Sequence, residues 1–218
     1  MQYKAVIFDL DGTLINSLED LADSVNEALV LRGYPQHHVN DYRMMVGNGA
    51  RMLIKRALPI SSADAIIDEV LAEYKKIYEK KFLCKTRPYP GILSMLEELK
   101  QRNVNIAVCS NKHNEAVGTL IDTLFPAATF QYAWGEQAGL PRKPAPDAVL
   151  KLAELMHVKP AETVYVGDSA VDMQTGLKAG MLTVGVLWGF RGRQELKDNG
   201  ANVLLTEPKE FFEKISLI

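Results

Sequence analysis

Short apolar runs alternate with amphipathic segments through much of this chain, and one such run stands near its beginning. Residues Ala5 to Phe8 are consecutive apolar residues, a pattern typical of a strand buried on both faces of a parallel sheet. The run ends at Asp9-Leu10-Asp11-Gly12-Thr13, where Gly12 permits a tight turn. Ligands in open α/β sheets bind beyond the carboxyl ends of the strands, so this segment is either a ligand site or a plain solvated turn.

The pattern between Leu14 and Lys85 is helical, with no strand signal. Apolar residues recur at three- and four-residue intervals in four stretches, which the glycine-rich turn Val46-Gly47-Asn48-Gly49 interrupts. The predicted helices cover residues 18–29, 41–45, 50–58 and 63–82. We therefore predict that residues 15–85 form an all-helical domain inserted directly after the first strand.

Strands and helices alternate in the predicted structure from Tyr89 onwards. Apolar runs separated by amphipathic helical patterns predict strands at residues 104–109, 131–135, 163–166, 182–187 and 202–205. Repeated alternation of this kind is typical of a doubly wound parallel sheet with right-handed crossovers. The expected fold class is α/β, with a core domain built from residues 1–14 and 86–218.

Three further groups of polar residues stand at predicted strand ends or before predicted helices. Ser110-Asn111 follows one strand, Lys143 precedes Pro144-Ala145-Pro146, and Gly167-Asp168-Ser169-Ala170-Val171-Asp172 follows another strand. Helix capping, helix initiation by proline and an acidic first turn explain each group without any function. Hydroxyl and amide donors can also bind a phosphate, and two carboxylates favour a hard cation.

Composition excludes several classes of partner. The chain has 218 residues, of which 47% are hydrophobic and 24% charged, with a formal net charge of −2. This charge provides no basic field for nucleic acid or an anionic membrane, so an anion site must be local. No apolar run is long enough to span a membrane, and Cys84 and Cys109 lack metal or redox spacing. We expect a cytoplasmic protein that binds neither nucleic acid nor membrane.

Together the four polar groups resemble the motifs of the haloacid dehalogenase superfamily in its phosphatase form. Asp9-Leu10-Asp11-Gly12-Thr13 is similar to the first motif, Asp-x-Asp-Gly-Thr, and Ser110, Lys143 and the Gly167–Asp172 segment follow in the family's order. The resemblance covers essentially the whole chain. It implies a Rossmann-like core with an inserted helical cap, and an enzyme that hydrolyses phosphoric monoesters with Mg²⁺.

The resemblance also implies a catalytic role for each acidic residue of the first motif. Asp9 would be the nucleophile that forms an aspartyl-phosphate. Asp11 would protonate the leaving alkoxide and later deprotonate the attacking water. Relatives that cleave carbon–halogen bonds lack the second Asp, so Asp11 favours phosphate-ester chemistry.

Metal and phosphate binding would involve the remaining motif residues. The resemblance implies that Asp9, the backbone carbonyl of Asp11 and Asp168 hold Mg²⁺, while Asp172 orients a metal-bound water or Lys143. The residues implied to bind the phosphoryl group are Gly12, Thr13, Ser110, Asn111 and Lys143.

The turn inside the helical insert resembles the cap segment of phosphoglycolate phosphatases. A glycine-rich turn that enters a helix presents free amides to an anion, and Arg51 adds positive charge. Gly47, Asn48, Gly49 and Arg51 are therefore candidate contacts to a small substrate carboxylate, such as that of 2-phosphoglycolate. The alternative is a connection between two helices, with Arg51 on a solvated face.

Other activities remain open at this point. A broad-specificity sugar or nucleotide phosphatase, a pyrophosphatase and a β-phosphoglucomutase-type phosphomutase would share the core motifs. A non-catalytic phosphate-binding protein is a further alternative, which the intact motif set disfavours. We expect the partner to be a small-molecule phosphate ester, and the protein to be a monomer or a weak homodimer.

Overall fold

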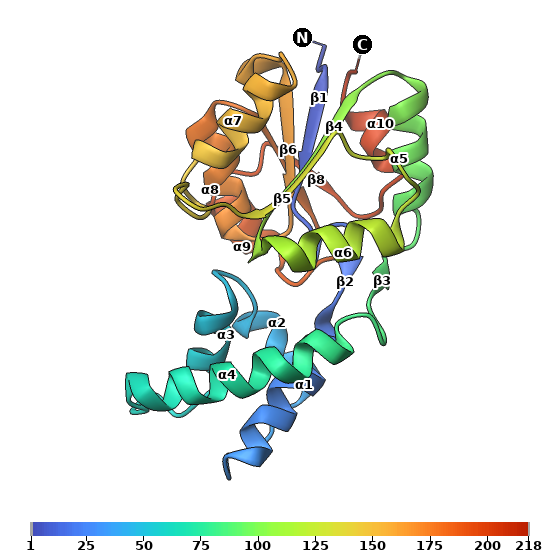
Figure 1. The fold of residues 1–218 in the computed structure, drawn as a ribbon. Coiled ribbons are helices and arrows are strands. Elements are labelled where there is room, and N and C mark those ends of the chain that lie inside the picture. The colour runs from blue at the N-terminus through green and yellow to red at the C-terminus, as the bar shows by residue number, and fades with distance from the viewer. Residues whose placement is uncertain (1, 218) are drawn as a thin grey trace. The chain divides into compact units, whose positions relative to one another are not determined.

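The computed structural model describes residues 2–217, which form two compact units (Figure 1). An α/β unit comprises the chain up to Ile15 and from Pro88 onward, and a helical unit comprises Asn16–Arg87. The boundaries fall inside two short strands, β2 (Ile15–Asn16) and β3 (Arg87–Pro88), which pair with each other. The sequence prediction of no strand between Leu14 and Lys85 is therefore wrong at β2, because a two-residue strand has no detectable period.

Six parallel strands form the sheet of the α/β unit, in the order β5-β4-β1-β6-β7-β8. Central strand β1 is fully buried on both faces, as its four apolar residues predict. The strands are β1 (Ala5–Phe8), β4 (Asn105–His113), β5 (Tyr132–Glu136), β6 (Thr163–Gly167), β7 (Leu182–Val186) and β8 (Val203–Leu205).

Helices cover both faces of this sheet, with α7 and α8 on one side and α5 and α10 on the other (Figure 1). Ile7, Tyr165, Val149 and Leu152 belong to the apolar cluster between the sheet and α7. The prediction of a doubly wound parallel sheet is confirmed. The helical segments of this unit are α5 (Ile92–Gln101), α6 (Asn114–Leu124), α7 (Asp147–Leu155), η2 (Pro160–Glu162), α8 (Ala170–Ala179), α9 (Arg193–Asp198) and α10 (Glu210–Lys214).

Some boundaries differ from those that the sequence predicts. Strand β4 continues to His113, with a register irregularity against β5 between Cys109 and His113. Helix α8 begins at Ala170, where Ser169 and Asp172 form a capping box. Helix α10 and strand β3 have no counterpart in the sequence prediction; both are too short for a clear period.

The helical unit is organised around the packing of α1 against α4. Its helices are α1 (Leu18–Leu31), η1 (Val39–Asp41), α2 (Tyr42–Met45), α3 (Ala50–Ala57) and α4 (Asp64–Lys81). The buried carboxylate of Asp20, in the first turn of α1, accepts hydrogen bonds from the Lys85 amide (3.0 Å) and from the Thr86 amide and hydroxyl (2.8 and 2.7 Å). One carboxylate thus joins the beginning of this unit to its end.

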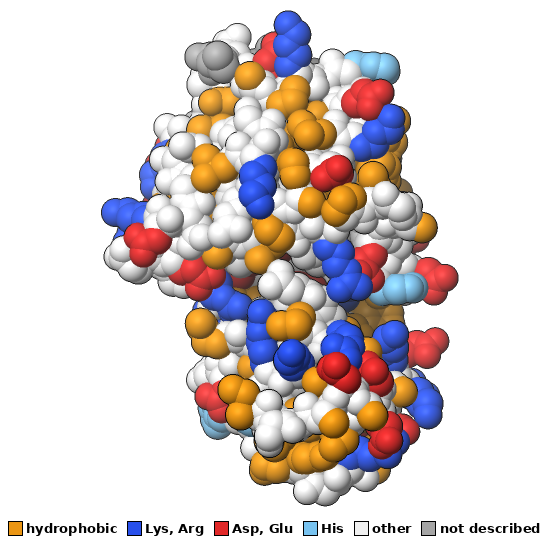
Figure 2. Space-filling model, turned by 90° about the vertical axis from the view of Figure 1, so that its left-hand side faces the viewer, with side chains coloured by type: hydrophobic (Ala, Val, Ile, Leu, Met, Phe, Trp, Pro, Cys, Tyr) orange, Lys and Arg blue, Asp and Glu red, His pale blue; other side chains and the backbone are white. Residues whose placement is uncertain are grey.

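The surface of the molecule carries both signs of charge. On the face shown in Figure 2, acidic, basic and hydrophobic side chains are interspersed. No helix among residues 2–217 combines the length and the apolar character that a membrane span requires.

Candidate active site

Three neighbouring strands, β4, β1 and β6, carry the motif residues at their carboxyl ends. Phe8 pairs in register with Val108 of β4 and Val166 of β6, so Asp9, Ser110 and Asp168 follow at one edge of the sheet. Parallel strands bring their ends to the same edge, which is how residues far apart in the sequence meet.

Lys143 is buried at this edge, and three groups surround its ammonium. Nζ donates to Oδ1 of Asp9 and to Oδ1 of Asp172, each at 2.8 Å, and to the Tyr165 hydroxyl at 3.0 Å. The side chain is only 4% exposed. Burial alone lowers the pKa of this ammonium, but Asp172 and Asp9 outweigh burial and hold the pKa well above its usual value. Lys143 is therefore a fixed positive charge.

The backbone of Lys143 is held by Asn111 from the end of β4. The Asn111 side-chain amide donates to the Lys143 carbonyl at 3.0 Å, and the Lys143 N–H donates to the Asn111 Oδ1 at 2.9 Å. Ser110 is buried beside Asn111, and its Oγ accepts the Lys112 N–H at 3.2 Å. The polar end of β4 thus fixes both its own turn and the lysine segment.

Asp9, Asp168 and Asp172 form a compact acidic cluster. One oxygen from each carboxylate lies within 4.8 Å of the others. Oδ2 of Asp172 accepts from the Ser169 amide (3.1 Å) and hydroxyl (2.6 Å), and Oδ2 of Asp168 accepts from the Phe190 amide at 2.6 Å. The structure therefore brings the acidic residues of the first and last motifs together.

Burial and the crowding of negative charge raise the pKa of two of these carboxyl groups. Burial, and then the neighbouring Asp172 carboxylate, raise the pKa of Asp9 to about 7, although Lys143 opposes the shift. Burial and the same neighbour raise the pKa of Asp168 well above its usual value. Three carboxylates beside one ammonium leave an excess of negative charge that a divalent cation would neutralise.

The donor set and its packing fit a small, hard cation. Mg²⁺ prefers carboxylate and carbonyl oxygen ligands, and the cluster offers oxygen alone. The backbone approaches Asp168 closely: a Cβ on Gly12 would lie 2.2 Å from Oδ2 of Asp168, and one on Gly189 would lie 2.3 Å from its Cβ. Gly12, at φ +84°, therefore combines a left-handed turn with room for the carboxylate.

Thr13 and Asp11 complete the first motif. Thr13 is fully buried, and its carbonyl accepts the indole N–H of Trp188 at 3.0 Å. Asp11 accepts two hydrogen bonds from Nζ of Lys112, one at each carboxylate oxygen and both at 3.0 Å. This second ammonium lies next to the proposed acid–base residue.

Sequence reasoning missed Lys112 and Tyr165. Lys112 stands three residues after the last apolar residue of β4, directly behind Ser110-Asn111, and only its proximity to that motif gives a signal. Tyr165 lies inside an apolar strand run, so its hydroxyl next to Lys143 has no sequence signature at all.

The candidate cap residues lie in the helical unit, at the beginning of α3. Gly47, Asn48 and Gly49 all have left-handed backbone, with φ of 114°, 62° and 83°. The Arg51 guanidinium forms ion pairs with Asp64 (3.0 Å) and Asp68 (2.9 Å) of α4. Arg51 is therefore engaged inside its own unit, and its contact with a substrate stays a prediction.

Arg56 also contributes to this turn. Its guanidinium donates to the carbonyls of Met45 (2.8 Å) and Gly47 (3.0 Å), so the turn is anchored from within α3. These hydrogen bonds lie within the helical unit. Contact of Gly47, Asn48 and Gly49 with a substrate therefore also stays a prediction.

Comparison with known proteins decides the family. The model of the haloacid dehalogenase-like hydrolases matches residues 6–186. This chain belongs to that family. Curated relatives include phosphoglycolate phosphatases of Pseudomonas putida (35% identical, 86% of this chain and 70% of the relative) and Psychrobacter arcticus (32% identical, 100% and 95%). The expected membership in the haloacid dehalogenase superfamily, in its phosphoglycolate phosphatase-like group, is confirmed.

Solved structures agree with this membership. The crystal structure of a candidate phosphoglycolate phosphatase from Lactobacillus delbrueckii subsp. bulgaricus has a TM-score of 0.94 and 34% identity, covering 99% of both chains. A second structure, from Haemophilus somnus, has a TM-score of 0.90 and 27% identity. This haloacid dehalogenase-like hydrolase is a phosphatase.

Proposed function

We propose that this phosphatase is a Mg²⁺-dependent phosphoglycolate phosphatase that acts through an aspartyl-phosphate on Asp9. The observation that carries the proposal is the hydrogen bond between the buried Lys143 ammonium and Oδ1 of Asp9, at the edge of a three-carboxylate cluster. Phosphoryl transfer needs positioning and neutralised charge more than unusual acidity, and this arrangement provides both. Relatives named phosphoglycolate phosphatase support the choice of substrate.

In the first step Asp9 attacks the phosphorus of the ester. A bond forms between its carboxylate oxygen and phosphorus, and the bond between phosphorus and the leaving oxygen breaks. Asp11 gives its proton to the leaving oxygen, so glycolate departs as a neutral alcohol at that end. Lys143 orients Asp9 and attracts the phosphoryl oxygens, together with Ser110 and Asn111.

In the second step a water molecule attacks the phosphorus of the aspartyl-phosphate. Asp11, now ionised, takes the proton from the water, and the bond between phosphorus and Asp9 breaks to release inorganic phosphate. The same carboxyl group therefore serves as acid and then as base, and the cycle restores both residues.

Asp9 and Asp168, with the Asp11 backbone carbonyl, would hold Mg²⁺. When bound, the ion supplies the positive charge that offsets the crowded carboxylates and the phosphoryl group. Asp172 serves this site indirectly, because one of its oxygens fixes Lys143 and the other caps α8.

The helical unit would serve as the cap that excludes water during the reaction. The amides of Gly47, Asn48 and Gly49, at the turn before α3, would contact the substrate carboxylate. Arg51 would add its charge only if it leaves Asp64 and Asp68.

A panel of phosphate esters, assayed with Mg²⁺, tests the proposal. We expect kcat/KM for 2-phosphoglycolate to exceed that for sugar phosphates, nucleotides and pyrophosphate. Equal rates across the panel would favour a broad-specificity phosphatase, and preference for pyrophosphate a pyrophosphatase. Isomerisation of β-glucose 1-phosphate without phosphate release would favour a phosphomutase. If the protein turns over none of these compounds, the assignment is refuted.

A further inference from the structure

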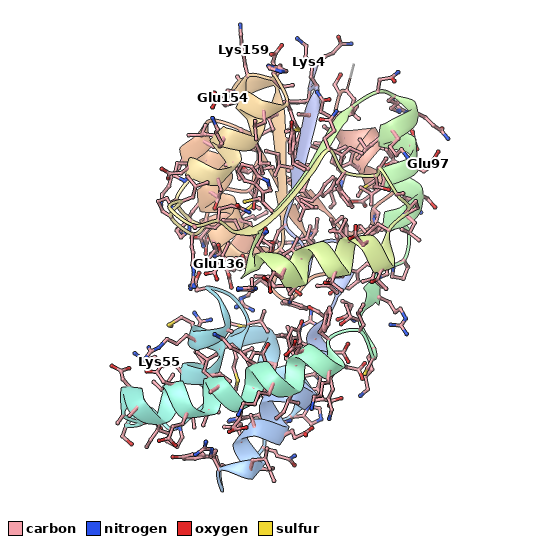
Figure 3. The ribbon with its side chains drawn as sticks, viewed as in Figure 1. Lys4, Lys55, Glu97, Glu136, Glu154 and Lys159 are labelled. Carbon is pink, nitrogen blue, oxygen red and sulfur yellow. The ribbon has the colours of Figure 1, made fainter. Side chains whose placement is uncertain are left out.

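Tyr165 lies in strand β6 and approaches the candidate site from the core of the α/β unit. It pairs in register with Ile7 of β1, and both residues belong to the apolar cluster between the sheet and α7. Figure 3 shows the two ends of this unit: Lys4 and Lys159, which precede β1 and β6, lie at one end, and Glu136, the last residue of β5, at the other. Tyr165 stands two residues before the end of β6, so the length of its ring brings the hydroxyl to the edge where the motif residues meet.

The hydroxyl of Tyr165 completes the hydrogen bonding of the Lys143 ammonium. An ammonium has three N–H donors and no acceptor. Within residues 2–217 its acceptors are the Tyr165 hydroxyl at 3.0 Å and one carboxylate oxygen each from Asp9 and Asp172 at 2.8 Å. The hydroxyl accepts this bond, so its own proton turns to Oδ1 of Asp172 or to the Cys109 carbonyl, each 3.4 Å away. Each N–H of the buried ammonium therefore has a partner.

The contact with Lys143 is made by the hydroxyl and not by the face of the tyrosine ring. Nζ lies 3.0 Å from the hydroxyl oxygen and 5.7 Å from the ring centroid. The difference is close to the distance from a phenol oxygen to the centre of its ring, so Nζ lies beyond the hydroxyl and nearly in line with it. A cation–π contact requires the cation over the ring face. The substitution Tyr165→Phe would therefore keep the packing of the ring and lose the contact with the ammonium.

The three acceptors contribute differently to the position of the ammonium. Asp9 and Asp172 are carboxylates, which attract it strongly. Two contacts alone would let the ammonium swing about the line that joins their two oxygens, because lysine is a flexible four-carbon stem. The Tyr165 hydroxyl, which is neutral at neutral pH, provides the third point. It fixes the direction of Nζ without adding negative charge to a crowded site.

We propose that Tyr165 is a positioning residue for phosphoryl transfer, whose hydroxyl fixes the Lys143 ammonium against Asp9 from the core side of the site. This inference rests on the proposed function, because it takes Asp9 as the nucleophile that Lys143 orients. The role concerns the nucleophile and the phosphoryl group, which are common to all phosphate esters. Its effect should therefore be the same for every ester that the protein hydrolyses, whatever the leaving alcohol.

A matched pair of tyrosine variants tests this role. Tyr165→Phe and Tyr132→Phe each remove one hydroxyl from a ring that packs in the same apolar cluster. The Tyr132 hydroxyl donates instead to the Leu155 carbonyl, at 3.5 Å. We expect Tyr165→Phe to lower kcat about tenfold and to change KM less than about twofold, because a displaced ammonium still attracts the bound ester but no longer holds the nucleophile in line. Tyr132→Phe should leave both constants unchanged.

Two inhibitors separate positioning from a merely structural role. Orthovanadate can adopt the five-coordinate geometry of the transfer, whereas inorganic phosphate resembles the ground state. Tyr165→Phe should weaken inhibition by orthovanadate about tenfold, as it lowers kcat, and change inhibition by phosphate less than about twofold. A loss of folded protein would instead lower the apparent kcat and leave both inhibition constants unchanged. Inhibition constants that stay unchanged, or that change by one common factor, would overturn the positioning role.

A second replacement covers the case in which Tyr165→Phe does not fold, as a melting experiment would show. Incorporation of 3-fluorotyrosine at position 165 keeps the ring and the hydroxyl, but the fluorine makes the oxygen a weaker acceptor. The same kinetic and inhibitor comparisons then apply, with 3-fluorotyrosine at position 132 as the control. We expect smaller changes in the same directions. A kcat equal to that of the wild type would contradict the proposal.

Failure of this inference is distinguishable from failure of the proposed function. Wild-type protein that prefers another ester to 2-phosphoglycolate would overturn only the proposed substrate, and that ester would serve in the Tyr165→Phe comparison. Turnover retained by Asp9→Asn would overturn both proposals. Wild-type protein that prefers 2-phosphoglycolate, together with a Tyr165→Phe variant of unchanged kcat, would overturn only the role of Tyr165.

Discussion

Asp172 connects Lys143 to the beginning of helix α8. One carboxylate oxygen accepts from Nζ of Lys143 at 2.8 Å, and the other accepts from the amide and hydroxyl of Ser169. The position of the ammonium that faces Asp9 is therefore set by a helix cap. Damage to the cap should appear in catalysis as well as in stability.

The substitution Asp172→Asn tests this connection. We expect kcat to fall by about 10- to 100-fold, typical for residues that orient metal or phosphate ligands, and stability to fall by about 1 kcal/mol through the weaker cap. Removal of the Asp172 charge should also lower the pKa of Asp9, because that charge helps to raise it. Steady-state kinetics and urea denaturation measure the first two effects. An unchanged kcat would show that Lys143 does not depend on this carboxylate.

The raised pKa of Asp9 makes Mg²⁺ binding and stability depend on pH. In the metal-free protein the folded-state pKa is about 7, against 3.8 for an unperturbed Asp. A carboxyl group with a raised folded-state pKa favours folding most at low pH, so its contribution should decrease as pH rises from about 4 to about 7. Mg²⁺ competes with this proton, and its apparent affinity should increase over the same interval.

Calorimetric titration with Mg²⁺ between pH 5 and pH 8, and melting with EDTA in place of Mg²⁺, measure both trends. Asp9→Asn is the control, since it removes the titrating group and should flatten the dependence of metal-free stability on pH. A Mg²⁺ affinity that is constant across this range would contradict the prediction.

Asp9→Asn should abolish turnover and at the same time raise the melting temperature. We expect no measurable turnover, because an amide cannot form the acyl phosphate. At pH 8 without Mg²⁺ the variant should melt at a higher temperature than the wild type, since one of three crowded buried charges is gone. Phosphate-release assays and melting curves test the two effects separately. Retained turnover would remove Asp9 as the nucleophile.

Gly12→Ala should damage the site through a steric clash. The added Cβ would lie 2.2 Å from Oδ2 of Asp168, and the φ of +84° adds strain of about 1 kcal/mol. The matched control is Gly139→Ala, at φ +82° with no heavy atom within 4 Å of the added Cβ. Both variants should lose similar backbone stability, but only Gly12→Ala should lose Mg²⁺ affinity and activity. Equal activity in the two variants would contradict this account.

The sheet was predictable because its strands are short apolar runs buried on both faces, as β1 shows. Motif residues at strand ends were predictable as neighbours for the same reason, since parallel strands end at one edge. Asp9 and Asp168 were therefore expected together from the ends of their strands, whereas the place of Lys143 beside them followed from the resemblance to the haloacid dehalogenase motifs. The roles given to them remain proposals.

No periodic pattern in the sequence indicates which side chains of distant segments make contact. The pairing of Arg51 with Asp64 and Asp68 depends on how α3 packs against α4, which a periodic pattern does not specify. Lys112 meets Asp11 only because β4 lies beside β1 and continues past Cys109. Tyr165 was indistinguishable from its apolar neighbours, because one hydroxyl does not alter the burial of a strand residue.

The carboxylate of Asp20 joins the two ends of the helical insert. It accepts hydrogen bonds from the amides of Lys85 and Thr86, where the chain leaves that insert. The two ends of the insert are thus held together by hydrogen bonds that belong to the insert itself. An insert whose two ends are joined in this way can be exchanged for another without altering the α/β unit that carries Asp9, Lys143 and Asp168.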